Sequence, residues 1–144
     1  MARRIADILF QNFKKGKRRM AQSILIIDDD IICQNMLRST LIQAGYTVIV
    51  ASDGDEGIEK ATKEPPSLII LDIMMPGMDG GEVAGVLKND PKTAGIPIIF
   101  LSSLITAKEK MIGGKDDVIS FLSKPYNRDE LLNEIKNYFL TDIK

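Results

Sequence analysis

Residues 24–30 read Ile-Leu-Ile-Ile-Asp-Asp-Asp, a short apolar run that changes at once into three acids. Three later apolar runs end on polar side chains in the same manner: residues 67–71 lead into Asp72, residues 98–101 into Ser102-Ser103, and residues 118–123 into Lys124-Pro125. In open parallel sheets, ligands bind at the carboxyl ends of the strands, near the point where the strand order reverses. Acids, a hydroxyl and a lysine at four such ends therefore indicate a functional site.

Strand-like and helix-like segments alternate from residue 24 onward. We expect strands near 24–28, 47–50, 67–72, 97–101 and 118–122, and helices near 30–44, 54–63, 80–89, 104–112 and 127–140. The strands are continuous runs of β-branched residues and leucine, as in a parallel sheet that is covered on both faces. Strand–helix alternation with right-handed crossovers predicts an α/β three-layer sandwich.

The composition bounds the class of protein. The chain has 144 residues, 44% of them hydrophobic, which is enough for one domain but not for two of ordinary size. Its one cysteine, Cys33, excludes an internal disulfide and suits a reducing cytosol, so we expect a cytoplasmic protein. Cys33 itself is expected to be a small buried residue of a helix. No apolar run approaches the roughly 18 residues of a membrane span.

Charge divides the chain near Met20. Residues 1–19 carry seven basic side chains and one acid, whereas the remainder carries twelve basic and nineteen acidic groups. We therefore expect an N-terminal arm over residues 1–21 and one domain over residues 22–144. The arm is either an amphipathic segment that docks on anionic lipid or a partner, or a disordered leader upstream of a start at Met20. Nucleic-acid binding by this arm would be electrostatic and unspecific.

Asp28, Asp29 and Asp72 are the strongest candidate site residues. If the first and third strands are neighbours, as in the order 2-1-3-4-5, the three carboxylates converge and repel one another unless a cation lies between them. Hard oxygen ligands with room for water suit Mg²⁺. Asp28 and Asp30 could instead cap the next helix. Asp72, however, leads into the loop Ile73-Met74-Met75-Pro76-Gly77, where no helix begins.

Lys124 and Ser102 complete the candidate site. The restriction on residues that precede proline keeps Lys124 extended before Pro125. Its ammonium can then reach a phosphate or carboxylate as a point charge. Taken alone, each residue is typical of an ordinary turn, but beside the acids they indicate function.

These motifs resemble the receiver domain of two-component response regulators. They are Ile24-Leu25-Ile26-Ile27-Asp28-Asp29-Asp30, the segment Leu71-Asp72-Ile73-Met74-Met75-Pro76-Gly77-Met78-Asp79-Gly80, the strand that ends in Ser102-Ser103, and Phe121-Leu122-Ser123-Lys124-Pro125-Tyr126. The resemblance covers about residues 22–141. It implies a flavodoxin-like (βα)5 fold, a three-layer sandwich with a parallel five-stranded sheet in the order 2-1-3-4-5.

The resemblance also implies a phosphoacceptor and a metal site. Asp72 would accept a phosphoryl group from a phosphohistidine of a partner histidine kinase or phosphotransfer protein. Asp29, Asp72 and the backbone carbonyl of Met74 would ligate Mg²⁺, and Asp28 would act largely through water. Because the chain contains no histidine, the donor must act in trans.

Further residues would bind the phosphoryl group and transmit the signal. Ser102 and Lys124 would bind its oxygens, helped by the backbone N–H groups of Met74 and Ser103. Ser102 would then move inward and free space for Phe121, so that the face formed by the fourth helix, fifth strand and fifth helix repacks for a downstream protein target. Phe121 stands where a tyrosine is frequent, so a contact through a hydroxyl is absent there.

Two apolar positions bear on the lifetime of the phosphorylated form. Met74 and Leu104, two residues after Asp72 and Ser102, offer no polar group to orient an attacking water. We therefore expect slow self-dephosphorylation, over many minutes or longer. Since the chain ends after the fifth expected helix, we expect a stand-alone receiver without an output domain. It would catalyse only its own phosphorylation and dephosphorylation and would not be a conventional enzyme.

Three alternatives fit less well. A hydrolase of the haloacid dehalogenase type needs a second acid two residues after the nucleophile, where this chain has Met74. A P-loop is excluded at Gly113-Gly114-Lys115, because no Ser or Thr follows the lysine. A degenerate receiver that binds partners without phosphorylation remains open, although every expected site group is present.

Overall fold

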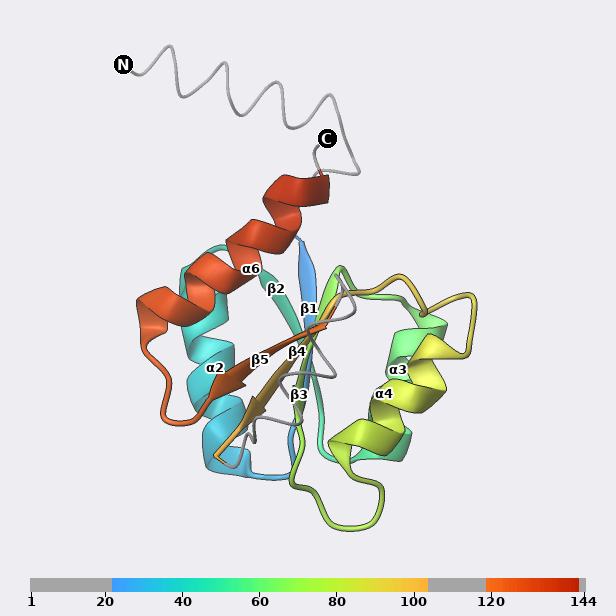
Figure 1. The fold of residues 1–144 in the computed structure, drawn as a ribbon. Helices are drawn as coiled ribbons and strands as arrows, with labels where there is room; N and C mark the ends of the chain where they lie inside the picture. Colours follow the sequence, from blue (N-terminus) through green and yellow to red (C-terminus); the bar gives the residue numbers. More distant parts are fainter. Residues whose placement is uncertain (1–21, 104–118, 143–144) are drawn as a thin grey trace, which may run out of the picture.

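Five strands and the helices beside them form the part of the chain that the structure describes, which is residues 22–103 and 119–142 of a computed structural model (Figure 1). The strands are β1 (Ser23–Ile27), β2 (Thr47–Ala51), β3 (Leu68–Asp72), β4 (Ile98–Ser102) and β5 (Ile119–Ser123). The helices are α2 (Ile31–Gln43), α3 (Gly54–Lys63), α4 (Gly80–Lys88) and α6 (Arg128–Asp142). The helix expected near 104–112 and the arm over residues 1–21 lie outside the described residues.

All neighbouring strands run parallel, in the order β2-β1-β3-β4-β5. This confirms the expected flavodoxin-like topology. The strand order reverses at β1, which lies between β2 and β3, and its Ile27 pairs with Leu71 of β3. The residues that follow Ile27 and Leu71 therefore meet at the switch point of the sheet, where ligands of such folds bind.

The sheet separates two hydrophobic cores. α3 and α4 cover one face, and α2 and α6 cover the other (Figure 1). In the first core, strand residues Leu25, Ile27, Ile69, Leu71, Ile98 and Phe100 pack against Ala61, Val83 and Leu87 of the helices. In the second core, Ile24, Ile26, Leu68, Ile70, Ile99 and Leu101 pack against Leu37, Leu41, Leu131 and Ile135. Because both faces of the central strands are buried, these strands are apolar without alternation.

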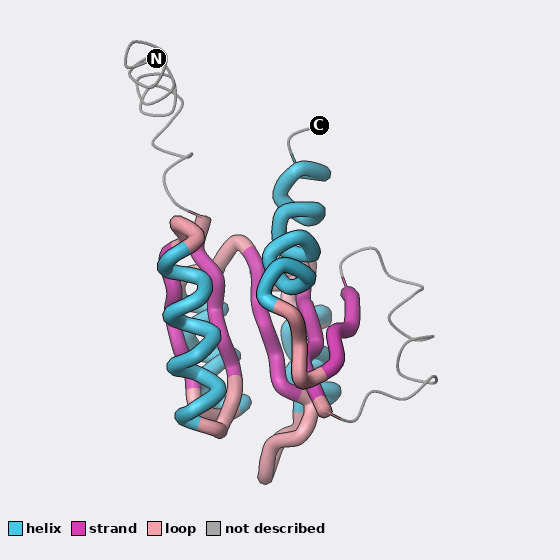
Figure 2. Tube along the Cα trace, turned by 90° about the vertical axis from the view of Figure 1, so that its left-hand side faces the viewer, coloured by secondary structure: helices cyan, strands magenta, loops and turns pink. Residues whose placement is uncertain are grey.

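The described helices α2, α3, α4 and α6 run back along the sheet, antiparallel to the strands (Figures 1 and 2). In the view of Figure 2 the two helices of the second core lie in front of the strands. The described ends of the chain, the start of β1 and the end of α6, lie at the amino end of the sheet (Figures 1 and 2). The opposite edge, where the strands end, carries the loops in which the acids, the serine and the lysine were predicted.

Aspartates fix where three of the helices begin. Asp30, Asp53 and Asp79 keep extended backbones, and their side chains accept hydrogen bonds from N–H groups of the first turns of α2, α3 and α4. Such caps satisfy donors that have no partner within the helix. The first helix therefore begins at Ile31, one residue later than expected, because Asp30 is its cap.

Ser120 of β5 is a destabilising feature that can be tested. Its hydroxyl is buried and finds no hydrogen-bond partner among the described residues. Leaving a buried polar group without a partner costs about 1–3 kcal/mol, so we expect Ser120→Ala to raise the free energy of unfolding by about 1 kcal/mol in urea titrations. Ser67→Ala is the matched control, because the Ser67 hydroxyl accepts the Ser23 N–H at 3.2 Å and its loss should lower stability. A loss of stability in Ser120→Ala would contradict this account.

Candidate functional site

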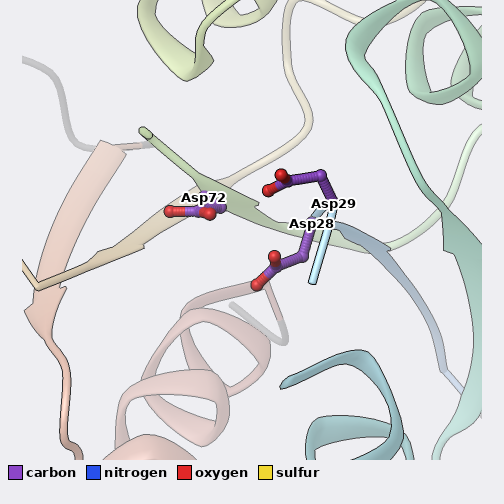
Figure 3. A group of neighbouring side chains, drawn as sticks. All are labelled: Asp28, Asp29 and Asp72. Atoms are coloured by element: carbon purple, nitrogen blue, oxygen red, sulfur yellow. The ribbon is translucent and has the colours of Figure 1, made fainter. Parts of the chain in front are cut away.

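Three carboxylates meet beyond the ends of β1 and β3. Asp28 and Asp29 directly follow β1, and Asp72 is the last residue of β3. One oxygen from each of the three carboxyl groups lies within 4.8 Å of the other two (Figure 3). The convergence expected from the strand order is therefore present, and the parallel register of β1 and β3 is its cause. Asp30 is not part of the cluster, because it caps α2.

Asp28 is buried and held at every polar atom. Its N–H donates to the carbonyl of Ala51 at 3.1 Å, and its Oδ1 accepts the N–H of Asp30 at 2.9 Å. Its Oδ2 accepts a hydrogen bond from Lys124 Nζ at 3.2 Å, and its carbonyl accepts one from the Gln34 side chain. Asp28 is only 2% exposed, so its direction is set by these partners.

Asp29 and Asp30 are both exposed but differ in their surroundings. Asp30 accepts hydrogen bonds from the N–H groups of Cys33 and Ile32, and these lower the pKa of its carboxyl group. No described residue donates a hydrogen bond to the Asp29 carboxylate. Asp29 therefore has its oxygens available for a cation or water, whereas Asp30 has a structural role.

The surroundings of the Asp72 carboxyl group disfavour its ionised form. It is 7% exposed, and burial together with the charge of Asp28 raises its pKa to about 6. Lys124, whose Nζ lies 3.9 Å from Asp72 Oδ2, and the N–H of Met74, which donates to Oδ1 at 3.2 Å, oppose this rise only in part. A cation in the cluster would favour the ionised carboxylate and lower this pKa.

Lys124 lies between the acids. Burial lowers the pKa of its ammonium, but the charges of Asp28 and Asp72 outweigh burial, and the pKa is raised overall. Its backbone N–H donates to the carbonyl of Ser102 at 2.9 Å, which ties the end of β5 to the end of β4. The peptide bond between Lys124 and Pro125 is cis. Lys124 is thus a permanent cation at the site.

Ser102, Ser103 and Phe121 occupy the β4–β5 side of the site. Ser102 is fully buried as the last residue of β4, and Ser103 is exposed directly after it. Phe121 is half-buried and packs its ring on Phe100, with the centroids 5.0 Å apart and the planes at 18°. Leu104, the other position predicted to influence the phosphoryl lifetime, lies outside the described residues.

The loop from Asp72 to α4 is held close to the end of β3. The N–H of Gly80 donates to the carbonyl of Ile73 at 3.0 Å, and a Cβ on Gly80 would lie 2.5 Å from the Asp72 carbonyl oxygen. Only glycine fits there, because the clash would be with backbone that cannot rotate away. The loop leaves the Met74 side chain 54% exposed beside the acids.

Two site neighbours differ from what the sequence indicated. Cys33 lies on α2 as expected, but it is half-buried rather than buried, and its Sγ lies 3.7 Å from Lys124 Nζ. Burial raises the pKa of its thiol. Gln34, which holds the Asp28 carbonyl, was not predicted at all. The sequence feature that could have indicated it is a polar residue at the helical spacing of the buried residues Leu37 and Leu41.

A search of the described helices finds none that is long and apolar enough to cross a membrane.

Comparisons with known proteins agree with this arrangement. The profile of the response regulator receiver domain matches residues 24–136. The DNA-binding dual master transcriptional regulator RpaA of Synechocystis is 37% identical over 113 residues, which cover 78% of this chain and 47% of that protein. The alkaline phosphatase synthesis transcriptional regulatory protein PhoP of Bacillus subtilis is 36% identical over 81% of this chain and 48% of its own. The chain thus spans about half the length of these curated relatives.

Solved structures share the fold over nearly their whole length. The chemotaxis protein CheY4 of Vibrio cholerae has a TM-score of 0.76 and 31% identity, and the match covers 82% of this chain and 98% of that one. A response regulator from Desulfuromonas acetoxidans has a TM-score of 0.73 and 33% identity, with 83% and 98% covered.

The raised pKa of Asp72 predicts how the free energy of unfolding depends on pH. The pKa of Asp72 rises from 3.8 to about 6 on folding, so the folded state binds this proton more tightly than the unfolded state does. The free energy of unfolding therefore falls as the pH is raised from about 4 to about 6. Asp72→Asn removes this fall in stability, because an amide does not ionise. Without metal, the variant should therefore exceed the wild type by about 1–3 kcal/mol at pH 7.5, since one pKa unit is worth about 1.4 kcal/mol.

Urea titrations of both proteins at several pH values measure this difference. The two proteins should have equal stability below about pH 4 and diverge up to about pH 6, the window that the two pKa values set. Asp55→Asn, on an exposed residue of α3, should change stability little at any pH. A gap between Asp72→Asn and the wild type that does not grow with pH would contradict the raised pKa.

Proposed function

Because the chain belongs to the receiver-domain family of two-component response regulators, we propose that it is a signalling switch activated by phosphorylation of Asp72. The observation that supports this most is the convergence of Asp28, Asp29 and Asp72 with Lys124 at one edge of the sheet. A structural role explains Asp30, which caps α2. It does not explain Asp72, a buried carboxylate with a raised pKa at the end of β3.

The same cluster suits Mg²⁺. Carboxylate and carbonyl oxygens are its preferred protein ligands, and it keeps several waters when bound. Asp29 and Asp72 would hold it together with the backbone carbonyl of Met74, and Asp28, whose oxygens are already paired, would act through water. When bound, Mg²⁺ would neutralise charge on the acceptor and on the incoming phosphoryl group.

In the proposed transfer, an Asp72 carboxylate oxygen forms a bond to phosphorus while the P–N bond to the donor imidazole breaks. The electron pair of the broken bond stays on the imidazole nitrogen. Lys124 and the Ser102 hydroxyl would bind the transferred oxygens, with the N–H groups of Met74 and Ser103. The Met74 N–H already donates to Asp72 Oδ1, so it points into the space that an acyl phosphate would occupy. The chain would catalyse only its own phosphorylation and hydrolysis and would not act as a conventional enzyme.

Phe121 would carry the signal away from Asp72. Movement of Ser102 toward a bound phosphoryl group would change the space beside β5, where the Phe121 ring stacks on Phe100. The surface that responds would include β5, α6 and the expected helix near 104–112, and a downstream protein would bind there. The phosphoryl donor would be a histidine kinase or phosphotransfer protein in the cytoplasm. Specific contact with nucleic acid is not part of this proposal, and neither a membrane nor a partner role of residues 1–19 has support from the described residues.

Phosphorylation can be tested directly by intact-mass spectrometry. Incubation of the full chain with acetyl phosphate and Mg²⁺ should add one phosphoryl group. Asp72→Asn, or omission of Mg²⁺, should abolish the adduct. If the wild type stays unmodified while it binds Mg²⁺, the chain is a receiver that binds its partners without phosphorylation.

The exposed Met74 side chain predicts a long-lived phosphoryl group. Met74→Asn places an amide where it can orient an attacking water, so the decay measured by the same mass assay should become at least about tenfold faster, a small share of what a positioned polar group can contribute. Met74→Leu, which stays apolar, should decay at the wild-type rate. Equal rates for Met74→Asn and the wild type would refute this explanation of the lifetime.

A further inference from the structure

Gln34 is a buried amide that the proposed phosphoryl transfer does not use. It is 7% exposed on the core-facing side of α2, in line with Leu37 and Leu41. Burying an amide among apolar side chains costs free energy unless its hydrogen bonds are made. The contacts of Gln34 therefore indicate what this side chain contributes.

The Gln34 amide connects the ends of β1 and β2. Its Nε2 donates to the Asp28 carbonyl oxygen and, at 3.1 Å, to the Ser52 hydroxyl. A backbone carbonyl can only accept, so the nitrogen and not the oxygen of the amide must face it. Ser52 belongs to the loop before α3, and its own N–H donates to Glu56 Oε1 at 2.7 Å. Gln34 is thus fixed between two anchored loops.

The Asp28 carbonyl is part of the peptide group that links Asp28 to Asp29. With Gln34 in place, the N–H, the carbonyl and both carboxylate oxygens of Asp28 all have partners. Asp29 differs, because among the described residues its carboxylate has no hydrogen-bond donor. The direction in which Asp29 points therefore depends on its backbone, and that backbone is held by Gln34.

We propose that Gln34 is a positioning residue for the metal site. By fixing the peptide plane between Asp28 and Asp29, it directs the Asp29 carboxylate toward Asp72, where the two share a cation. The inference rests on the proposed function, since it concerns the same Mg²⁺ site. Groups that orient metal ligands without touching the metal contribute about 10- to 100-fold to affinity.

The variant Gln34→Met keeps the length of the side chain and removes the donor. Isothermal titration calorimetry of the full chain with MgCl₂ should give a dissociation constant about 10- to 30-fold weaker than that of the wild type. Ser52→Ala removes only the second partner of Gln34 and should leave the affinity within about twofold, since the Asp28 bond remains. Gln34→Leu serves if Gln34→Met does not fold.

Thr93→Val is the control for a merely structural effect. Thr93 is 1% exposed, and its hydroxyl donates to the Leu87 carbonyl at 2.6 Å, in the loop before β4 at the amino end of the sheet. It therefore loses a buried hydrogen bond to a carbonyl, as Gln34→Met does, but far from the acids. Thr93→Val should lower the urea midpoint and leave Mg²⁺ affinity unchanged.

A second readout needs no metal. Amide hydrogen exchange by NMR should be faster at Asp30 in Gln34→Met than in the wild type, because the Asp30 N–H donates to Asp28 Oδ1 and this contact depends on how the Asp28 backbone is held. Wild-type Mg²⁺ affinity in Gln34→Met, or an equal loss in Thr93→Val, would overturn the inference. If the wild type binds no Mg²⁺, the proposed function fails, and unchanged exchange at Asp30 would separately refute the positioning role.

Discussion

The parallel pairing of β1 with β3 in a single register is the constraint on which the site depends. It brings the residues after Ile27 and Leu71 to the same edge, and with them the acids. The register cannot slip, because both strands are buried on both faces and a shift by one residue would exchange the two cores. The energy that fixes the positions of the carboxylates is therefore hydrophobic and comes from side chains that never contact a ligand.

That rigidity keeps like charges together. Asp28 and Asp72 cannot move apart without disturbing their strands, so burial and the charge of Asp28 raise the pKa of Asp72. Lys124 balances part of the charge and is itself made a stronger base by its two neighbours. A cation bound between these carboxylates would reduce their repulsion. Such a balance suits a switch, in which a small change of charge must alter the packing around it.

The fold was predictable because its signals lie in contiguous segments. Continuous apolar runs gave the strands, and turn residues between them gave the alternation with helices. Asp72 and Lys124 could be singled out because each follows a strand directly. Gln34 could not, since a lone glutamine on a helix has no local signature, and its meaning comes from Asp28 and Ser52, which the fold brings to it. Cys33 is less buried than predicted, because the pattern of apolar residues on a helix does not show how closely the neighbouring elements cover each position.

The contact between Lys124 and Asp28 joins residues 96 positions apart, from the first strand of the sheet to the loop after the last. A chain made from its N-terminus assembles the acids first and receives its cation only when β5 docks. An interrupted or incompletely folded chain would hold three carboxylates without the lysine that balances part of their charge. The charge balance of the site is thereby tied to completion of the fold, because the acids and their counter-ion come from opposite ends of the domain.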